Sequence, residues 1–240
     1  MRNYIYKLII DDVTDLCYNN TLSYFRPHSR ILDVGIGNGI MIRKYHHLIR
    51  EKSLDITGID INRNYLNHCS SLISTWKLED HIHVLHEPVE TYEPPEMQYF
   101  DYLLFSMSFM LFTDQGLVLE RIRPWLKPDG RVLFFQTMFK DRSLFMEVVK
   151  PRLKYLTTVD FGRVTYNNDF AALLEKKHLS VKENRLLKKE WFKGEYHLFI
   201  TGFEGGAETD AVSLANETRH SPAEQRIPSP RNHTIKECGC

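Results

Sequence analysis

Residues 30–39 read RILDVGIGNG, a short apolar run that ends in three glycines at alternate positions. The run Arg30–Gly35 has the length and composition of a strand buried on both faces of a sheet. The next segment, Asn38–Arg50, has the length of a helix. Glycines at such a junction adopt positive φ and let the backbone approach a ligand, and the helix N-terminus behind them presents free N–H groups. This stretch therefore predicts a strand, a tight glycine turn and a helix that together form a binding edge.

The same alternation of short apolar runs and longer segments continues along the chain. The further strands expected are Asp55–Asp60, His81–Glu87, Phe100–Ser106 and Arg131–Gln136, with helices at Asn62–Trp76, Thr113–Trp125 and Asn168–His178. Two last strands, Val181–Leu187 and Tyr196–Phe203, are joined by a short connection, which favours an antiparallel pair. Strand–helix alternation of this kind predicts an α/β, doubly wound sheet.

The two ends of the chain differ from this central region. The first 25 residues mix tyrosines with aliphatic residues, and we expect a helix that lies over the mouth of the sheet as a lid. Residues 205–240 contain three prolines and no Phe, Tyr or Trp. Such a stretch cannot bury enough apolar surface to offset its ordering entropy. The expected organisation is one folded domain over residues 1–204 and a disordered tail over residues 205–240.

Charge and composition narrow the functional classes. Lys and Arg number 31, as do Asp and Glu, and this balance argues against a chain that wraps a nucleic-acid backbone. No apolar run approaches the ~18 residues of a membrane span. The four cysteines show no CxxC spacing, which indicates free thiols in a reducing, cytoplasmic setting. His81 and His83 alternate on one strand face, but no Cys or acid completes a ligand set, so no metal site is expected.

An acidic residue ends the second expected strand, where a ribose would bind. Asp60 follows Gly39 by 21 residues, and one carboxylate can accept hydrogen bonds from both ribose hydroxyls. The glycine spacing is G-x-G-x-G, not the G-x-G-x-x-G of dinucleotide-binding enzymes, and no G-x-x-x-x-G-K-[ST] phosphate loop is present. A ligand with a ribose and no phosphate fits these residues better than a dinucleotide. The alternative is a tight strand–helix turn with an incidental Asp.

Four motifs together resemble the small-molecule branch of the class I S-adenosylmethionine-dependent methyltransferases. They are ILDVGIGNG at 31–39, GID at 58–60, FDYLLFS at 100–106 and WLKPDGRVLFF at 125–135, and the likeness covers about residues 25–203. The resemblance implies a Rossmann-like seven-stranded sheet with its last strand antiparallel and helices on both faces. It also implies S-adenosyl-L-methionine as cofactor and transfer of its methyl group to a small-molecule acceptor by in-line displacement.

The resemblance also assigns cofactor-binding residues at the ends of the first four strands. They are Asp33, Gly35, Gly37, Gly39, Asp60, Ile61, Glu87 and Ser106. Asp33 and the glycines match positions around the methionine part, and Asp60 matches the ribose acid. Glu87 matches the place of an acid beside the adenine amino group, with Glu90 as a second candidate. Ser106 matches the turn next to the reacting methyl group.

Apolar residues after the fourth and fifth strands are candidates for the acceptor pocket. The candidate substrate-binding residues are Met107, Phe109, Met110, Met138 and Tyr166. They predict an apolar, adaptable pocket, with packing in the core as the alternative. Tyr4, Tyr6 and Tyr166 are candidates for a lid or an aromatic cage around an amine, or for packing at an edge, and Tyr4 and Tyr6 are also candidate catalytic residues. His86 is a candidate general base or an exposed loop residue, and a base is needed only if the acceptor must lose a proton.

Two other functions remain open from the sequence. One is transfer of a different group from the same cofactor, and the other is a non-catalytic methyltransferase-like protein with an interaction or regulatory role. The intact glycine loop and Asp60 favour retained cofactor binding. Ser106-Met107-Ser108-Phe109 differs from the N-P-P-Y-type motif of enzymes that methylate flipped bases or amide nitrogens. The expected partner is therefore a small-molecule acceptor and not a nucleic acid.

Overall fold

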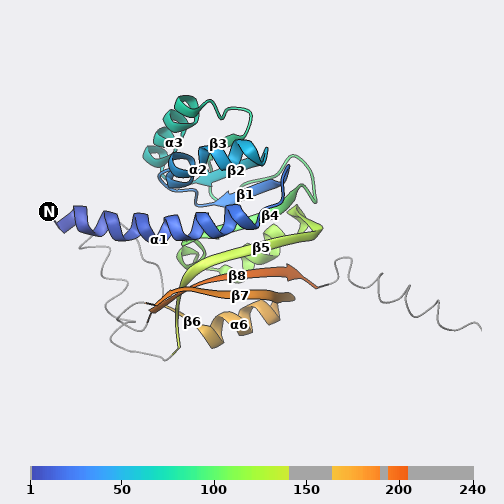
Figure 1. Cartoon of the computed structure of the whole chain (residues 1–240). Coiled ribbons are helices and arrows are strands. Elements are labelled where there is room, and N and C mark those ends of the chain that lie inside the picture. The colour runs from blue at the N-terminus through green and yellow to red at the C-terminus, as the bar shows by residue number, and fades with distance from the viewer. Residues whose placement is uncertain (1, 141–163, 190–193, 205–240) are drawn as a thin grey trace, which may run out of the picture. The chain divides into compact units, whose positions relative to one another are not determined.

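The computed structural model describes residues 2–140, 164–189 and 194–204, with side chains from Val13 onward. The strands are β1 (Arg30–Val34), β2 (Asp55–Asp60), β3 (Ile82–His86), β4 (Phe100–Ser106), β5 (Leu126–Phe139), β6 (Thr165–Tyr166), β7 (Leu179–Lys189) and β8 (Gly194–Phe203). The helices are α1 (Arg2–Tyr24), α2 (Ile40–Glu51), α3 (Arg63–Trp76), α4 (Gln115–Ile122) and α6 (Asn167–Lys176), with 3-10 turns η1 (Phe109–Leu111) and η2 (Arg123–Trp125). Figure 1 labels most of these elements. The tail expected over residues 205–240 lies outside the described residues.

The strands form one sheet in the order β3-β2-β1-β4-β5-β8-β7. Strands β1 to β5 run parallel to one another, whereas β8 is antiparallel to both β5 and β7. The predicted doubly wound sheet with an antiparallel last strand is therefore confirmed. The two-residue strand β6, which pairs with Met138 and Phe139 of β5, was not predicted. Strand β5 also begins at Leu126 rather than at Arg131, because a register irregularity lets β4 pair with Leu126 as well.

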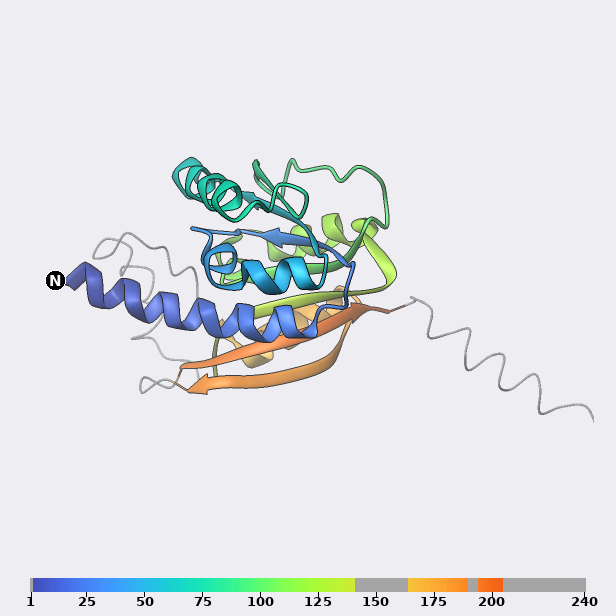
Figure 2. The same ribbon diagram turned by 45° about the horizontal axis from the view of Figure 1, so that its top comes forward.

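Helices cover both faces of the sheet, as expected (Figures 1 and 2). Buried residues of α1, α2 and α3 pack together on one face, and those of α4, η2 and α6 pack on the other. The second half of α1 is part of this packed layer, since Cys17, Tyr18 and Leu22 are at most 1% exposed. This part of α1 lies along the sheet, whereas the expectation placed the helix over the mouth. In the described part of the chain, no helix has the length and apolar character needed to cross a bilayer.

Side chains in the connections after β2 and β4 cap the helices that follow these strands. Asn62 caps α3 by accepting hydrogen bonds from the N–H groups of Asn64 and Tyr65 at 3.0 and 3.4 Å. Asp114 caps α4 by accepting from Leu117 N–H at 2.9 Å. Helix α4 ends at Ile122 and not at the expected Trp125, because Pro124 lacks an N–H group and sits in the 3-10 turn η2. These caps place polar turns next to the strand ends.

A cluster of phenylalanines holds β4, β5 and β8 to η1 and α6. The ring of Phe134 stacks on Phe105 with centroids 5.3 Å apart and meets the edges of Phe109 and Phe170 at 4.7 and 5.4 Å. Phe170 in turn contacts Phe199 at 5.0 Å. Aromatic pairs in these geometries add about 0.5–1.5 kcal/mol each beyond the burial of their area. This cluster fixes the carboxyl ends of β4 and β5 against the helix face.

Removal of the central ring should cost a large part of the stability. Phe134→Ala should lower the free energy of unfolding by about 3–5 kcal/mol, because the buried site cannot collapse around the lost ring. Urea denaturation followed by circular dichroism measures this change. Leu117→Ala is the matched control, since Leu117 is 56% exposed and its loss should change stability by less than about 0.5 kcal/mol. Equal effects of the two substitutions would contradict the assigned core.

Candidate functional site

The turn between β1 and α2 is built by three glycines in the left-handed region. Gly35, Gly37 and Gly39 have φ of 81°, 67° and 78°. Gly35 N–H donates to the carbonyl of Ile59 at 2.8 Å, which ties the turn to the end of β2. Gly39 is the N-cap of α2 and no side chain caps this helix. The first N–H groups of α2 therefore face the carboxyl edge of the sheet without a side-chain partner.

The three glycines differ in the space beside them. A Cβ atom at Gly35 would lie 2.7 Å from Ser108 Cβ, and one at Gly39 would lie 2.9 Å from Leu72 Cδ1. At Gly37 the nearest atom would be the carbonyl oxygen of Gly35, at 4.0 Å. Gly35 and Gly39 are thus needed for close packing within the protein. Gly37 borders open space, and this is the position where a ligand can approach the backbone.

Asp60, at the end of β2, faces the glycine turn. Its carboxylate accepts hydrogen bonds from Gly37 N–H at 3.0 Å and from Asn62 N–H at 2.8 Å, one to each oxygen. A carboxylate has about four lone-pair positions, so each oxygen can accept one further bond from a ligand. The following Ile61 is 73% exposed, which leaves an apolar side chain beside the acid. This pair can bind a group that has two hydroxyls and an apolar ring.

Two residues at the end of β3 complete this half of the edge. His86 is exposed, and its Nε2 lies 2.9 Å from the carbonyl oxygen of Ile61. This contact links β3 to the residue after β2. Glu87 directly follows β3 and is half-buried, whereas Glu90 is exposed. Of the two acids considered for the adenine amino group, Glu87 is thus nearer to the strand end.

A buried carboxyl lies beneath the glycine turn. Asp33 of β1 is fully buried, and Tyr18 of α1 donates its hydroxyl to Asp33 Oδ2 at 2.9 Å. The other oxygen, Oδ1, has no hydrogen-bond partner among the described residues. Burial raises the pKa of Asp33 to about 7, the Tyr18 hydrogen bond opposes this rise, and the nearby charge of Asp60 adds to it. A cation that reaches Oδ1 would favour the ionised carboxylate.

Sequence reasoning missed several residues of this arrangement. Tyr18 approaches Asp33 from a helix that is distant in sequence, and no local pattern indicates the contact. Ser108 donates to the carbonyl of Val34 and holds the chain after β4 against β1. Cys69 donates its thiol to the carbonyl of Gly37 at 3.3 Å, and burial raises its pKa to about 12. This thiol therefore supports the loop and is not a reactive nucleophile.

The expected acceptor residues lie in two different environments. Phe109, Met110 and Met138 are at most 2% exposed, and Phe109 packs within the phenylalanine cluster. Met107 is half-buried with a φ of 58°, and its N–H donates to the carbonyl of Phe135 at 2.8 Å. Tyr166 lines a cavity. The role of all five in acceptor binding stays a prediction, as does that of Tyr4 and Tyr6, whose side chains lie outside those described.

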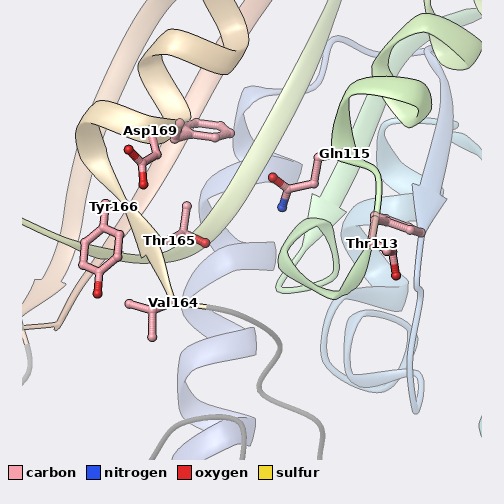
Figure 3. Close-up of a pocket in the computed structure, with 8 residues that line it drawn as sticks. Thr113, Gln115, Val164, Thr165, Tyr166 and Asp169 are labelled. Atoms are coloured by element: carbon pink, nitrogen blue, oxygen red, sulfur yellow. The ribbon is translucent and has the colours of Figure 1, made fainter. Parts of the chain in front are cut away.

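Ser106 and the cavity define the other half of the edge. Ser106 ends β4, and its hydroxyl is buried. Beyond it, a cavity opens between the start of α4 and the start of α6 (Figure 3). The residues lining it are Phe112, Thr113, Gln115, Val164, Thr165, Tyr166, Asp169 and Phe170. The structure thus brings Asp33, the glycine turn, Asp60 and Ser106 to one edge, with a cavity beyond the end of β4.

Comparisons with known proteins agree with this geometry. A family model described as a methyltransferase domain matches residues 31–130. The ubiquinone/menaquinone biosynthesis C-methyltransferase UbiE of Wigglesworthia glossinidia brevipalpis is 27% identical over 181 residues, which cover 73% of this chain and 71% of that enzyme. The carboxy-S-adenosyl-L-methionine synthase of Aliivibrio fischeri is 22% identical, and the match spans only half of each chain.

Solved structures with the same fold include a geranyl diphosphate C-methyltransferase from Streptomyces coelicolor, crystallised with Mg²⁺, geranyl diphosphate and S-adenosyl-L-homocysteine. Its TM-score is 0.60 at 11% identity, and the match covers 74% of this chain and 73% of that one. At this identity the likeness concerns the fold alone. It confirms the Rossmann-like arrangement of helices around the sheet.

The buried Asp33 predicts how stability depends on pH. Its pKa is raised in the folded state, so between about pH 4 and pH 7 the folded protein holds a proton that the unfolded chain releases. Stability should therefore fall as the pH rises through this window. In Asp33→Asn this fall should be smaller, because the amide does not ionise. Urea denaturation at about pH 5 and pH 7.5 measures both slopes.

Asp80→Asn is the control for this experiment, since Asp80 is an exposed carboxylate that precedes β3, at the amino ends of the parallel strands, whereas Asp33 lies near the carboxyl end of β1. Its pH dependence should match that of the unsubstituted chain. If Asp33→Asn also keeps the original slope, Asp33 does not titrate in the folded protein as described.

Proposed function

We propose that this chain, which belongs to the class I S-adenosylmethionine-dependent methyltransferases, transfers a methyl group to a small-molecule acceptor bound beyond the ends of β4 and β5. The observation that carries the proposal is the pairing of the open Gly37 backbone with the Asp60 carboxylate at one edge of the sheet. Together they offer backbone approach and two free acceptor positions, as a ribose without a phosphate requires.

The residues at this edge fit S-adenosylmethionine part by part. Asp60 would accept the ribose hydroxyls, and exposed Ile61 would pack against the adenine ring. Glu87 is the acid for the adenine amino group. Asp33, with one oxygen unpaired, would take the positive charge of the methionine part together with the glycine turn. Ser106 would lie next to the reacting methyl group, where its hydroxyl oxygen can accept a weak contact.

Methyl transfer requires the protein mainly to hold the two reactants in the right positions. When bound, S-adenosylmethionine supplies a methyl group already activated on a sulfonium. The residues of this chain hold the two reactants in line, an effect that can supply up to about 7–11 kcal/mol of the barrier. Tyr18 holds the Asp33 carboxyl in place through its 2.9 Å hydrogen bond, and both side chains are buried. His86, which is exposed and bonded to Ile61, stays a candidate base for acceptors that lose a proton.

A second function is favoured by one comparison. The likeness to a carboxy-S-adenosyl-L-methionine synthase extends over half of this chain, so the same cofactor pocket could support transfer of another group. Mass spectrometry of the reaction product separates the two functions. A product heavier than the acceptor by one methyl group supports methyl transfer, whereas a product that carries another group, or a modified cofactor, supports the alternative.

The charge balance and the cysteines of the chain support a class of acceptor and a location for the reaction. The equal numbers of acidic and basic residues support a small-molecule acceptor over a nucleic acid. Cys17 and Cys69 are free and buried, which supports a cytoplasmic location. The C-methyltransferase relative named above also acts, by its name, in the biosynthesis of small molecules. We therefore expect an acceptor that enters the cavity beyond β4.

Asp60 provides the first test of the cofactor site. Asp60→Ala should lower the affinity for S-adenosylmethionine at least about tenfold, because charge-assisted hydrogen bonds to the ribose are lost. Isothermal calorimetry with the purified chain measures this affinity. Asp55→Ala is the control, because Asp55 lies at the amino end of the same strand, opposite to Asp60. This substitution should leave the affinity unchanged. Unchanged affinity in Asp60→Ala would contradict the proposal that Asp60 binds the ribose of S-adenosylmethionine.

The glycine turn provides the second test. Gly37→Ala should fold with a stability loss of about 1–2 kcal/mol for the left-handed backbone. It should nevertheless lose most S-adenosylmethionine binding, because its methyl group occupies the open space. Gly35→Ala should instead lose more stability, since its Cβ would lie 2.7 Å from Ser108 Cβ. Denaturation and calorimetry on both variants check this contrast, and normal cofactor binding by Gly37→Ala would speak against the site.

A further inference from the structure

The buried carboxyl of Asp33 is surrounded by groups that do not neutralise a negative charge. The described titratable side chains that interact with it are Cys17 and Tyr18 on α1, Cys69 on α3 and Asp60 at the end of β2. Cys17, Tyr18 and Cys69 are at most 1% exposed, and burial raises the pKa of each, so these three groups are neutral near pH 7. Asp60 is a second acid. An ionised Asp33 is therefore a buried charge with no cation among these neighbours.

The two oxygens of Asp33 have different surroundings. Oδ2 accepts the hydroxyl of Tyr18 at 2.9 Å, whereas Oδ1 has no hydrogen-bond partner among the described residues. One donor offsets only part of the cost of burying a full charge, and the neutral acid avoids that cost. Burial accordingly raises the pKa of Asp33 to about 7. Oδ1 is thus the position where the carboxyl can hold either a proton or a cationic group of a ligand.

Asp33 lies between the two strand ends that form the proposed cofactor site. It pairs with Gly58 of β2 on one side and with Leu104 of β4 on the other. Asp60 and Ser106, which end these two strands, follow the paired residues by two positions. A nucleoside whose ribose binds to Asp60 can therefore direct a short cationic arm toward Asp33. The amino-acid part of S-adenosylmethionine is such an arm, because it carries an ammonium group.

We propose that the ammonium group of the bound cofactor displaces a proton from Oδ1 of Asp33, and that Tyr18 is the positioning residue that sets the pH of this exchange. The inference rests on the proposed function, because it takes the cofactor site as given. The neutral carboxyl loses its O–H proton to the buffer, and the carboxylate that remains pairs with the ammonium group. One positive charge thus replaces another, and the buried site never holds an unpaired charge.

The direction of the pH dependence follows from the unoccupied site. Below about pH 7 the carboxyl of Asp33 holds a proton that the ligand has to displace, whereas above this pH the carboxylate is already present. The affinity should therefore rise about tenfold between pH 6 and pH 8 and then level off. Binding should release about one proton near pH 6 and almost none near pH 8.

Three ligands with the same nucleoside test the exchange on the full, unsubstituted chain. S-adenosyl-L-homocysteine carries the ammonium group, S-adenosyl-3-thiopropylamine keeps it without the carboxylate, and 5′-methylthioadenosine lacks the whole amino-acid part. Calorimetry near pH 6 in MES and in imidazole, two buffers with different enthalpies of protonation, counts the protons released. The two ligands with an ammonium group should each release about one proton. 5′-Methylthioadenosine should release none and should bind equally at pH 6 and pH 8.

Two tyrosine substitutions test the role of Tyr18. Its hydrogen bond stabilises the ionised carboxylate and opposes the rise in the pKa of Asp33. Tyr18→Phe should therefore move the midpoint of the affinity–pH curve for S-adenosyl-L-homocysteine upward by about one pH unit. Tyr45→Phe is the matched control, since Tyr45 of α2 donates its hydroxyl to Asp15 of α1 at 2.8 Å. This control removes a similar hydrogen bond to α1 and should leave the midpoint unchanged.

The outcomes distinguish this inference from the proposed function. If none of the three nucleosides binds, the proposed function is refuted and this inference with it. Binding without proton release, equal release by all three ligands, or binding of 5′-methylthioadenosine alone would overturn the inference and leave a nucleoside site in place. A midpoint that does not move in Tyr18→Phe, or that moves equally in Tyr45→Phe, would overturn the role of Tyr18.

Discussion

The hydrogen bond from Gly37 N–H to the Asp60 carboxylate joins the turn after β1 to the end of β2, and the rest of the site depends on it. Gly37 has a φ of 67°, a backbone conformation that residues with a side chain rarely adopt, so glycine lets the chain turn here into α2. With one N–H bound to each oxygen, Asp60 keeps one further acceptor position on each oxygen for a ligand. Binding geometry is thus a consequence of how the chain turns between two neighbouring parallel strands.

This arrangement has an energetic cost that the fold compensates elsewhere. Asp33 lies buried near Asp60, and burial and like charge both oppose its ionisation. Only Tyr18 donates to it among the described side chains, and Oδ1 is left without a partner. A buried polar atom without a partner costs about 1–3 kcal/mol, which the phenylalanine cluster and the packed helices can offset. Stability is lowered at the place where a cationic ligand would restore it.

Most of the fold could be predicted from the sequence, but less of the site could be. Strand ends and the glycine turn were predictable because RILDVGIGNG and Asp60 act through neighbours in one βαβ unit. Phe109 shows the limit, since a phenylalanine after a strand has the same pattern whether it faces a cavity or the core. Its surroundings are decided by Phe134 and Phe170, which are distant in sequence. Tyr18 and the two-residue strand β6 likewise depend on long-range docking that no local periodicity encodes.

The carboxyl edge of the sheet is divided into two chemically different halves. The ends of β1 and β2 carry carboxylates and exposed backbone, and they are fixed by hydrogen bonds between main chain and side chain. The ends of β4 and β5 continue into η1 and β6, whose cavity is aromatic with one acid among its described lining residues. The hydrogen bonds of Asp60 are made with Gly37 and Asn62, and none of these three residues lines the cavity. Acceptor preference can therefore change independently of the half that is proposed to bind the cofactor.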